Sequence, residues 1–122
     1  TGFRNIIIQN FQNLSDRPDK GALLENVLFC ELFKDGFNLN YWRTKSQAEV
    51  DLIAEKNQVL IPIEIKSHLG KITSTRSIYS FINKYNTKVA IIFSDKLIDK
   101  KNIDDKYLLF LPFWFGVPEL TY

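Results

Sequence analysis

The segment Val59-Leu60-Ile61-Pro62-Ile63-Glu64-Ile65-Lys66-Ser67 decides the fold, because its residues alternate as those of a β-strand do. Successive side chains of a strand point to opposite faces, which divides this segment into two sets. One face carries four branched apolar residues: Val59, Ile61, Ile63 and Ile65. The other face carries Leu60, Pro62, Glu64 and Lys66, with the two charged residues about 7 Å apart. Since proline lacks an N–H, we expect the strand to be irregular or at a sheet edge beside Glu64.

The residues before this segment predict a helix followed by a hairpin. The clearest helix covers Gly21–Lys34, with Asp19 as its N-cap and Asp35-Gly36 as its end. Within that helix, Cys30 is expected to be an inert core residue. The hairpin consists of strands Phe37–Arg43 and Glu49–Glu55 around a turn at Thr44–Gln47, and a second turn at Lys56-Asn57 leads into the deciding strand. Near the beginning of the chain, the apolar spacing in Phe3–Leu14 predicts a short helix.

The residues after this segment predict a second helix and two more strands. A loop at His68–Ile72 precedes a helix from about Ser74 to Tyr85, whose inner stripe is Ile78, Phe81, Ile82 and Tyr85. Lys88–Phe93 is apolar at nearly every position, which predicts a central strand reached by a parallel crossover. Asp95–Lys106 is expected to be a charged loop or short helix before a last strand, Tyr107–Leu111. Residues 1–122 are therefore expected to form one α/β domain with a mixed sheet of about five strands flanked by helices.

Composition limits the kinds of protein this chain can be. With 122 residues, of which 45% are hydrophobic, it is long enough for one core and too short for two ordinary domains. A net charge of +2 is too small to indicate nucleic-acid binding by itself, and no apolar run is long enough to span a bilayer. One cysteine excludes an internal disulfide, so we expect a reducing, cytoplasmic setting. Because the chain starts at Thr1 and contains no methionine, we expect it to be part of a longer protein.

Acidic residues and a lysine stand at positions where strand and helix patterns otherwise expect apolar residues. Asp51 begins an apolar run in the strand before Glu64 and Lys66, and Glu25 lies within the apolar helix. Phosphodiester cleavage requires an activated water and relief of the charge on the phosphate, and carboxylate-bound Mg²⁺ supplies both. A lysine beside the carboxylates orients or deprotonates the water and offsets phosphate charge. Glu25, Asp51, Glu64 and Lys66 are therefore candidate catalytic residues, and the three acids are candidate ligands of Mg²⁺ or Mn²⁺.

A purely structural interpretation of the same residues stays open. Alternating Glu and Lys is also typical of a solvent-exposed sheet face, where cross-strand charge pairs stabilise the sheet slightly. Four cations are candidates for phosphate-backbone contacts, although an ordinary solvated surface charge is the favoured interpretation of each: Arg43, Lys45, Lys71 and Arg76. Glu49 is a candidate for supporting Asp51, and His68 is a less favoured candidate base. Among the aromatic residues, Tyr41 and Trp42 are expected in the core, whereas Phe113, Trp114 and Phe115 are consecutive and cannot all face inward.

Several segments together resemble a known family. These are Gly21-Ala-Leu-Leu-Glu25-Asn26, Tyr41-Trp42-Arg43-Thr44-Lys45, Ala48-Glu49-Val50-Asp51-Leu52-Ile53 and Pro62-Ile63-Glu64-Ile65-Lys66-Ser67. They are similar to the C-terminal domain of unknown function of many prokaryotic AAA-type ATPases, whose core resembles PD-(D/E)XK, restriction-endonuclease-like nucleases. Gly2-Phe3-Arg4-Asn5 resembles the start of that domain and Leu111-Pro112-Phe113-Trp114-Phe115 its end, so the resemblance covers essentially the whole chain.

The resemblance assigns a role to each candidate residue. It implies that Glu25 is the helix acid, Asp51 and Glu64 are metal ligands, and Lys66 is the catalytic lysine. The ATPase part is not represented, because Gly70-Lys71 is followed by isoleucine and lacks the glycine that a phosphate-binding P-loop requires upstream. ATP binding is thus expected in an N-terminal domain of the longer chain and not in these residues.

Two functions follow from the residues and the resemblance. The first is a Mg²⁺-dependent DNA phosphodiesterase linked to an AAA-type ATPase, for which the complete set of acids and lysine argues. The second is a non-catalytic module that binds nucleic acid or a partner, or regulates that ATPase, for which the modest charge argues. Expected partners are DNA, the ATPase domain of the same chain and a further copy of the chain, with no membrane.

Overall fold

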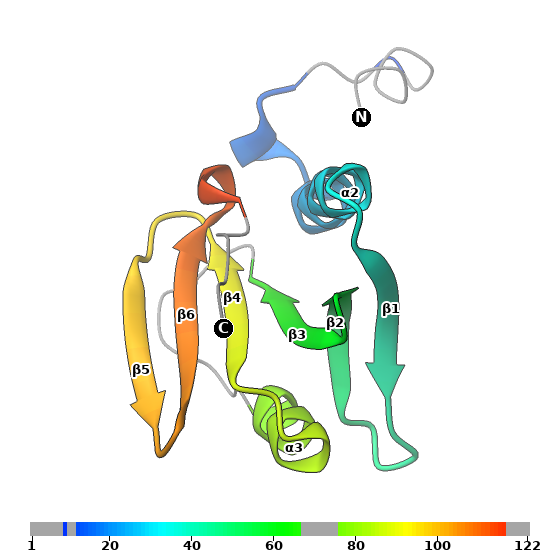
Figure 1. The fold of residues 1–122 in the computed structure, drawn as a ribbon. Helices are drawn as coiled ribbons and strands as arrows, with labels where there is room; N and C mark the ends of the chain where they lie inside the picture. Colours follow the sequence, from blue (N-terminus) through cyan, green and yellow to red (C-terminus); the bar gives the residue numbers. More distant parts are fainter. Residues whose placement is uncertain (1–8, 10–11, 67–75, 117–122) are drawn as a thin grey trace.

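The computed structural model describes residues 9, 12–66 and 76–116. Its regular elements are η1 (Leu14–Asp16), α2 (Lys20–Lys34), β1 (Asn38–Arg43), β2 (Glu49–Lys56), β3 (Val59–Ile65), α3 (Arg76–Tyr85), β4 (Val89–Ser94), β5 (Asp99–Ile103), β6 (Lys106–Pro112) and η2 (Phe113–Phe115). The strands form one sheet in the order β1-β2-β3-β4-β6-β5 (Figure 1). The described residues therefore form a mixed α/β fold.

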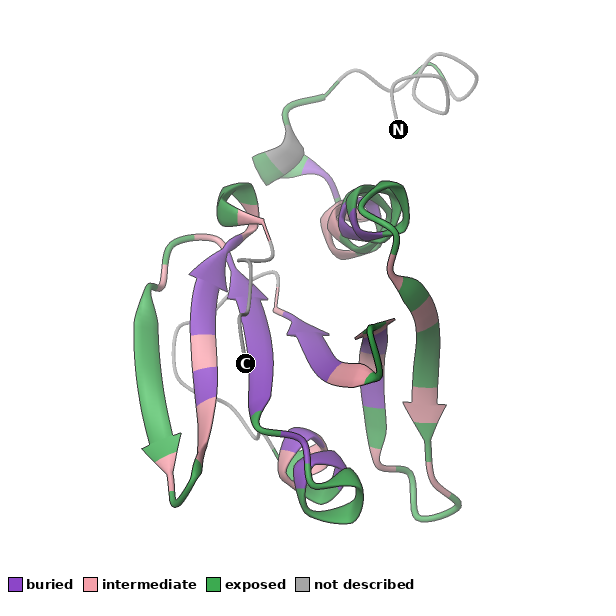
Figure 2. Cartoon of the chain, in the orientation of Figure 1, coloured by how far each residue is buried: buried purple, intermediate pink, exposed green. Residues whose placement is uncertain are grey.

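The sheet combines antiparallel hairpins with a parallel centre. β1, β2 and β3 form an antiparallel meander, β4 lies parallel to both β3 and β6, and β5 returns antiparallel to β6. Every residue of β4 is buried, as Figure 2 shows by its uninterrupted purple, which confirms the prediction of a central apolar strand. A strand covered on both faces needs apolar residues at successive positions rather than alternating ones.

The two long helices cover opposite faces of the sheet. Along β4, Val89, Ile91 and Phe93 pack in one cluster with Leu28 and Leu32 of α2. The intervening Ala90 and Ile92 pack in a second cluster with residues of α3, namely Ile78, Phe81 and Ile82. Because neighbouring residues of a strand face opposite ways, α2 and α3 must lie on opposite sides. The predicted faces of the deciding strand are confirmed as well, since Ile61, Ile63 and Ile65 all join the α2 cluster.

The element boundaries follow local sequence signals closely. α2 begins at Lys20 with Asp19 at the N-cap position, but the Asp19 side chain makes no capping hydrogen bond to the helix and instead accepts one from Arg17 Nε at 2.9 Å. The helix ends at Lys34, and Gly36, two residues later, has a φ of 85°, a conformation that favours glycine. The β2–β3 turn consists of Asn57 and Gln58, one residue later than predicted. The predicted loop at His68–Ile72 lies outside the described residues, as does most of the predicted helix Phe3–Leu14.

The structure corrects the sequence prediction for the segment between β4 and β6. Asp95–Lys106 is not a loop or short helix, because it contains the strand β5, and the sheet has six strands rather than about five. β5 reads Asp-Lys-Lys-Asn-Ile and has no apolar alternation, since it lies at the sheet edge and its first four residues are exposed. Charged residues on an edge strand also discourage pairing with other chains.

Four further predictions about single residues are wrong. Pro62 does not mark an edge or an irregularity, because it is buried in β3 between β2 and β4, and the β2–β3 register is continuous there. It is tolerated because the pairing of β3 with β4 begins only at the next residue, Ile63. Cys30 is exposed rather than in the core, and Tyr41 and Tyr85 are exposed as well. Trp42 is partly buried against the α3 cluster, as predicted.

Candidate active site at the ends of β2 and β3

A β-bulge places Asp51 at the candidate site. In the β1–β2 pairing, Asn40 is opposite Ile53 but Trp42 is opposite Val50, so β2 contains one extra residue in this interval. Asp51 and Leu52 are the two bulged residues, since together they lie opposite the single residue Tyr41. A bulge of this kind changes the direction of its side chains. As a result, Asp51 and Leu52 line the same pocket although they are consecutive in the strand.

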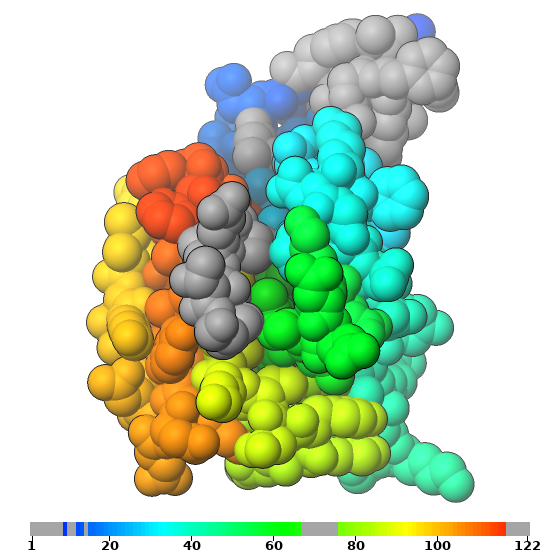
Figure 3. Space-filling view, viewed as in Figure 1, coloured from blue at the N-terminus to red at the C-terminus, as the bar shows by residue number. Residues whose placement is uncertain are grey.

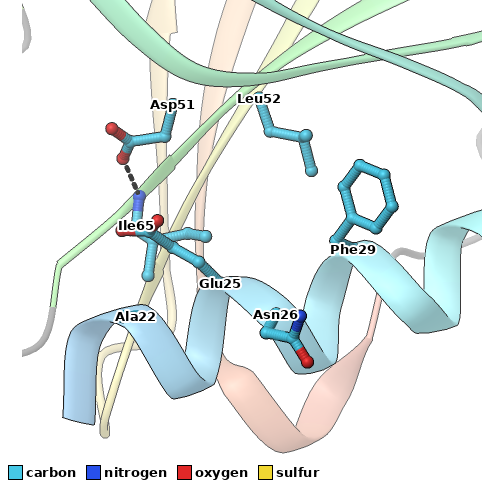
Figure 4. Close-up of a pocket in the computed structure, with 7 residues that line it drawn as sticks. All are labelled: Ala22, Glu25, Asn26, Phe29, Asp51, Leu52 and Ile65. Atoms are coloured by element: carbon cyan, nitrogen blue, oxygen red, sulfur yellow. Dashed lines mark hydrogen bonds between the residues drawn. The ribbon is translucent and has the colours of Figure 1, made fainter. Parts of the chain in front are cut away.

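The Asp51 carboxylate connects the two strands at their ends. Its Oδ2 accepts a hydrogen bond from the backbone N–H of Ile65 at 2.8 Å (Figure 4). The regular β2–β3 pairing starts one residue further into the sheet, at Leu52 and Ile63. The side chain of Asp51 therefore occupies the place of a backbone acceptor where the strands separate. Because Ile65 stands between Glu64 and Lys66, this bond holds the Asp51 carboxylate beside the Glu-x-Lys segment.

A pocket of about 400 Å³ lies between α2 and this end of the sheet. Its lining comes from the first half of α2, from the bulge of β2 and from the end of β3: Ala22, Glu25, Asn26, Phe29, Asp51, Leu52 and Ile65. In Figure 4 the Phe29 ring lies on the same side as Leu52, whereas Glu25 lies next to Ile65. The pocket thus has a carboxylate side and an apolar side. Its volume lies in the range of small-molecule sites.

Glu64 is a buried acid paired with Lys66. The residue is 4% exposed, and Lys66 Nζ lies 3.2 Å from its Oε2. The contact is an ion pair with poor hydrogen-bond alignment, so Oε2 accepts no well-formed hydrogen bond from the described part of the chain. Burial raises the pKa of Glu64, the Lys66 ammonium lowers it in part, and the charge of Asp51 raises it again. Glu64 is therefore a carboxylate whose ionised form is poorly stabilised.

Glu25 belongs to the same electrostatic group. Partial burial raises its pKa, and the charges of Asp51 and then Glu49 raise it further. Asp51 thus disfavours the ionised form of Glu25 on one side and of Glu64 on the other. Like charges gathered in this way are typical of functional sites, although structural networks produce them too.

The other predicted residues are placed less favourably. Arg43 and Glu49 form an exposed ion pair at 2.8 Å, so each already has a partner of opposite charge. Lys45 is exposed in the β1–β2 turn, and Arg76 is exposed at the first residue of α3. Ser77 Oγ accepts a hydrogen bond from the Glu49 N–H, which brings the start of α3 to the start of β2. Lys71 and His68 lie outside the described residues.

The three predicted acids are brought near one another only in part. Glu25 and Asp51 line one pocket, and the residues that line it, among those described, do not include Glu64. Within residues 9, 12–66 and 76–116, no group of three or more His, Cys, Asp or Glu side chains is arranged to bind a metal ion. In the same described part, no helix is long and apolar enough to cross a membrane.

Two pocket residues that matter were not predicted from the sequence. Phe29 lies four residues after Glu25, so both lie on one face of α2 one turn apart. This spacing was available as a signal, but Phe29 reads equally well as a core residue of an apolar helix. The position of Leu52 depends on the bulge, for which no local residue pattern gives a signal.

The family of the chain is shown by comparison with known sequences. Residues 20–114 match a family described as "Domain of unknown function (DUF4143)". The chain belongs to this family. The match runs from the first residue of α2 into η2, so it contains the whole sheet and the candidate site.

One curated relative extends the comparison. The chain is 33% identical over 117 residues to the uncharacterized protein MJ1544 of Methanocaldococcus jannaschii. The similarity covers 84% of this chain but 26% of the relative, so the chain spans about a quarter of that protein's length.

Proposed function

We propose that this chain is a PD-(D/E)XK-like domain and that the ends of β2 and β3 form a divalent-metal-dependent site for DNA phosphodiester hydrolysis. The observation that carries the proposal is the hydrogen bond from the Ile65 N–H to Asp51 Oδ2. It fixes one carboxylate beside a segment that contributes a second carboxylate and a lysine. An acid, a second acid and a lysine are the groups that phosphodiester cleavage with Mg²⁺ requires.

The fold supports the proposal. The antiparallel pairing of β2 with β3 brings Asp51 beside the Glu64–Lys66 segment, and α2 brings Glu25 to the same end of the sheet. A linked AAA-type ATPase domain is part of the same proposal. In the relative MJ1544, three quarters of the length lies outside the matching region, which leaves room for such a domain in that protein.

The residues present suit a hard divalent cation. Glu25, Asp51 and Glu64 supply only carboxylate oxygens, the ligands that Mg²⁺ and Mn²⁺ prefer. The Glu64 Oε2 atom is buried without a well-formed hydrogen bond, and the pKa values of Glu25 and Glu64 are raised. A cation would stabilise all three ionised acids. Binding by all three requires side-chain rotation, since the described acids are not already arranged around a metal position.

Each residue has a defined task in the proposed reaction. A bound divalent cation supplies Lewis-acid activation of water and offsets phosphate charge. Asp51 and Glu64 would hold that cation at the strand ends, and Glu25 would add charge from α2. Lys66 is one-third exposed, so its ammonium is accessible to a phosphate oxygen or to the attacking water. The ion pair with Glu64 keeps the Lys66 ammonium in place until substrate arrives.

The test is DNA cleavage by the purified full-length protein with Mg²⁺ or Mn²⁺. We expect Asp51→Asn and Lys66→Ala each to reduce cleavage by at least about a hundredfold, because each removes a group that acts on the reacting phosphate. Matched controls on β5, Asp99→Asn and Lys101→Ala, change the same residue types at exposed positions and should retain activity. Unchanged cleavage in both site variants would show that the activity arises elsewhere.

A second function is favoured by a different observation. The described acids are not arranged around a metal, and Glu64 is already partly neutralised by Lys66. A non-catalytic module that binds nucleic acid or a partner, or regulates the ATPase, would not need acids arranged around a metal ion. If it is correct, wild type and Asp51→Asn will both fail to cleave DNA. Adding Mg²⁺ will then raise the melting temperature of wild type no more than it raises that of Asp51→Asn.

A further inference from the structure

Two phenylalanines of α2 stay exposed next to the pocket. Phe29 is 44% exposed and Phe33 is 67% exposed. Their ring centroids lie 6.5 Å apart with planes only 4° from parallel. Because the two residues are four positions apart, they extend along one face of the helix from the position of Glu25. Glu25, Phe29 and Phe33 thus form a single stripe, with the acid at one end and the aromatic pair at the other.

Folding alone does not account for the aromatic pair. The contact of α2 with the core is supplied by Leu28 and Leu32, which are buried against the sheet. Burial of apolar area is what stabilises a fold, and an exposed ring contributes little of it. Adjacent exposed aromatic side chains are instead typical of binding surfaces. The end of α2 (cyan) lies open at the surface in the space-filling view (Figure 3).

The aromatic pair continues directly from the carboxylate pocket. Phe29 lines the pocket together with Asp51 and Leu52, and Phe33 stacks on Phe29 outside it. A ligand that fills this stripe needs a flat apolar part over the rings and an anionic part at the carboxylates, joined through a cation. A nucleotide has both parts, since its base has an apolar π-face and its phosphate binds divalent cations.

We infer that Phe29 and Phe33 form a stacking surface for unpaired nucleobases, so that the site acts on single-stranded nucleic acid. The choice of nucleic acid rests on the proposed function. The choice of single strands rests on the rings, because the π-faces of bases within a duplex are already covered by their neighbours. Aromatic stacking of unpaired bases is a general means of binding single strands without sequence preference. Unpaired DNA and RNA share this chemistry.

The test is binding of fluorescently labelled oligonucleotides by anisotropy, with the full-length protein in Ca²⁺ and in Mg²⁺. The probes are one single-stranded DNA, its RNA counterpart and the matching DNA duplex. We expect single strands to bind more tightly than the duplex, and Phe29→Ala and Phe33→Ala each to weaken single-strand binding about tenfold. Phe29→Tyr keeps an aromatic face and should retain affinity, whereas Phe29→Leu keeps apolar volume without a ring and should lose it.

Controls separate stacking from general surface stickiness and from misfolding. Ile98→Ala removes another exposed apolar side chain, 63% exposed between β4 and β5, and should bind like wild type. Melting curves establish that the Phe29 and Phe33 variants remain folded. Equal affinity for duplex and single strand, unchanged affinity in Phe29→Leu and Phe33→Ala, or no binding of single strands at all would each overturn the inference.

Failure of the inference can be told from failure of the proposed function. Ring-dependent binding of single strands without metal-dependent cleavage would support the stacking surface and reject the phosphodiesterase. Cleavage that depends on Asp51 and Lys66 but not on the Phe29 ring would do the reverse. Single-stranded DNA and RNA present the same unpaired base faces. Tighter binding of one of them therefore shows which nucleic acid the site takes.

Discussion

α2 and α3 cover opposite faces of one sheet, yet they distribute their apolar residues very differently. In α3 the apolar residues Ile78, Phe81 and Ile82 are all buried, and the remaining positions are mainly polar. In α2, two turns of leucine face the core while Val27, Phe29 and Phe33 remain exposed. Folding explains the three buried apolar residues of α3, and the exposed Tyr85 of that helix still packs against Phe81 and Trp42. Folding leaves part of α2 unexplained, and that part adjoins the carboxylates of the candidate site.

The comparison concerns the acids as well as the apolar residues. Two of the three acids, Glu25 and Asp51, share a pocket on the α2 side of the strand ends, whereas Glu64 alternates with Ile63 and Ile65 and so belongs to the other face of β3. The raised pKa of Glu25 means that its ionised form is less stable in the folded chain than in the unfolded one. The α2 region therefore contains groups that folding does not require, as expected for a surface that binds something else.

The largest expected change in the free energy of unfolding comes from a substitution in the α3 cluster. Phe81→Ala removes a ring that is 2% exposed in the α3 cluster, and should reduce the free energy of unfolding by about 3–5 kcal/mol. On α2, Phe33→Ala should change it by less than about 0.5 kcal/mol, because that ring is mostly exposed. Urea denaturation of both variants measures the difference. Similar losses in the two variants would mean that the exposed rings are part of the core, and the contrast between the helices would disappear.

A smaller change, in the pH dependence of the free energy of unfolding, is expected from replacing Glu64. Its raised pKa means that the folded chain binds more protons than the unfolded one above the ordinary glutamate pKa of 4.5. The free energy of unfolding of wild type should therefore fall as pH rises from 4.5 through the folded-state pKa. Glu64→Gln cannot ionise and should lack this decline. Urea denaturation between pH 4 and 8 tests it, with Glu31→Gln, an exposed acid of α2, as the control that keeps the decline.

The smallest effect is expected from Glu25. Its raised pKa has the same sign, but the side chain is exposed and water screens its charge, so the change in stability should be slight. Glu25→Gln should be marginally more stable than wild type at neutral pH, and more so at low salt than at high salt. Melting temperatures at two salt concentrations measure this. A decrease in stability at both would show that Glu25 makes a stabilising contact in the folded state.

Most of the sheet could be predicted from sequence because burial imposes a period on it. β3 and β4 follow from alternating and continuous apolar patterns, and α3 follows from its apolar stripe. β5 could not be predicted in this way, since an exposed edge strand of Asp-Lys-Lys-Asn needs no apolar face and depends on pairing with β6. The prediction from Pro62 was wrong because proline lacks only its own N–H donor. That donor is not needed at position 62, since the pairing of β3 with β4 begins at the next residue.

The candidate site was partly predictable for the same physical reason. Asp51, Glu64 and Lys66 stand out because they interrupt apolar runs, and the structure places Asp51 against the backbone between the other two. What sequence could not give is the orientation of Asp51, since the bulge depends on how β1 pairs with β2. Phe29 was not predicted because an apolar residue in an apolar helix carries no sign of being exposed.

The bond between Asp51 and the Ile65 amide has one more consequence. The amide proton of Ile65 is held by a side chain rather than by the neighbouring backbone. A cation that binds the Asp51 carboxylate withdraws electron density from its oxygens and should weaken that hydrogen bond. The chemical shift and exchange rate of this single amide are thus a spectroscopic gauge of occupancy, built into the sheet and readable without substrate turnover.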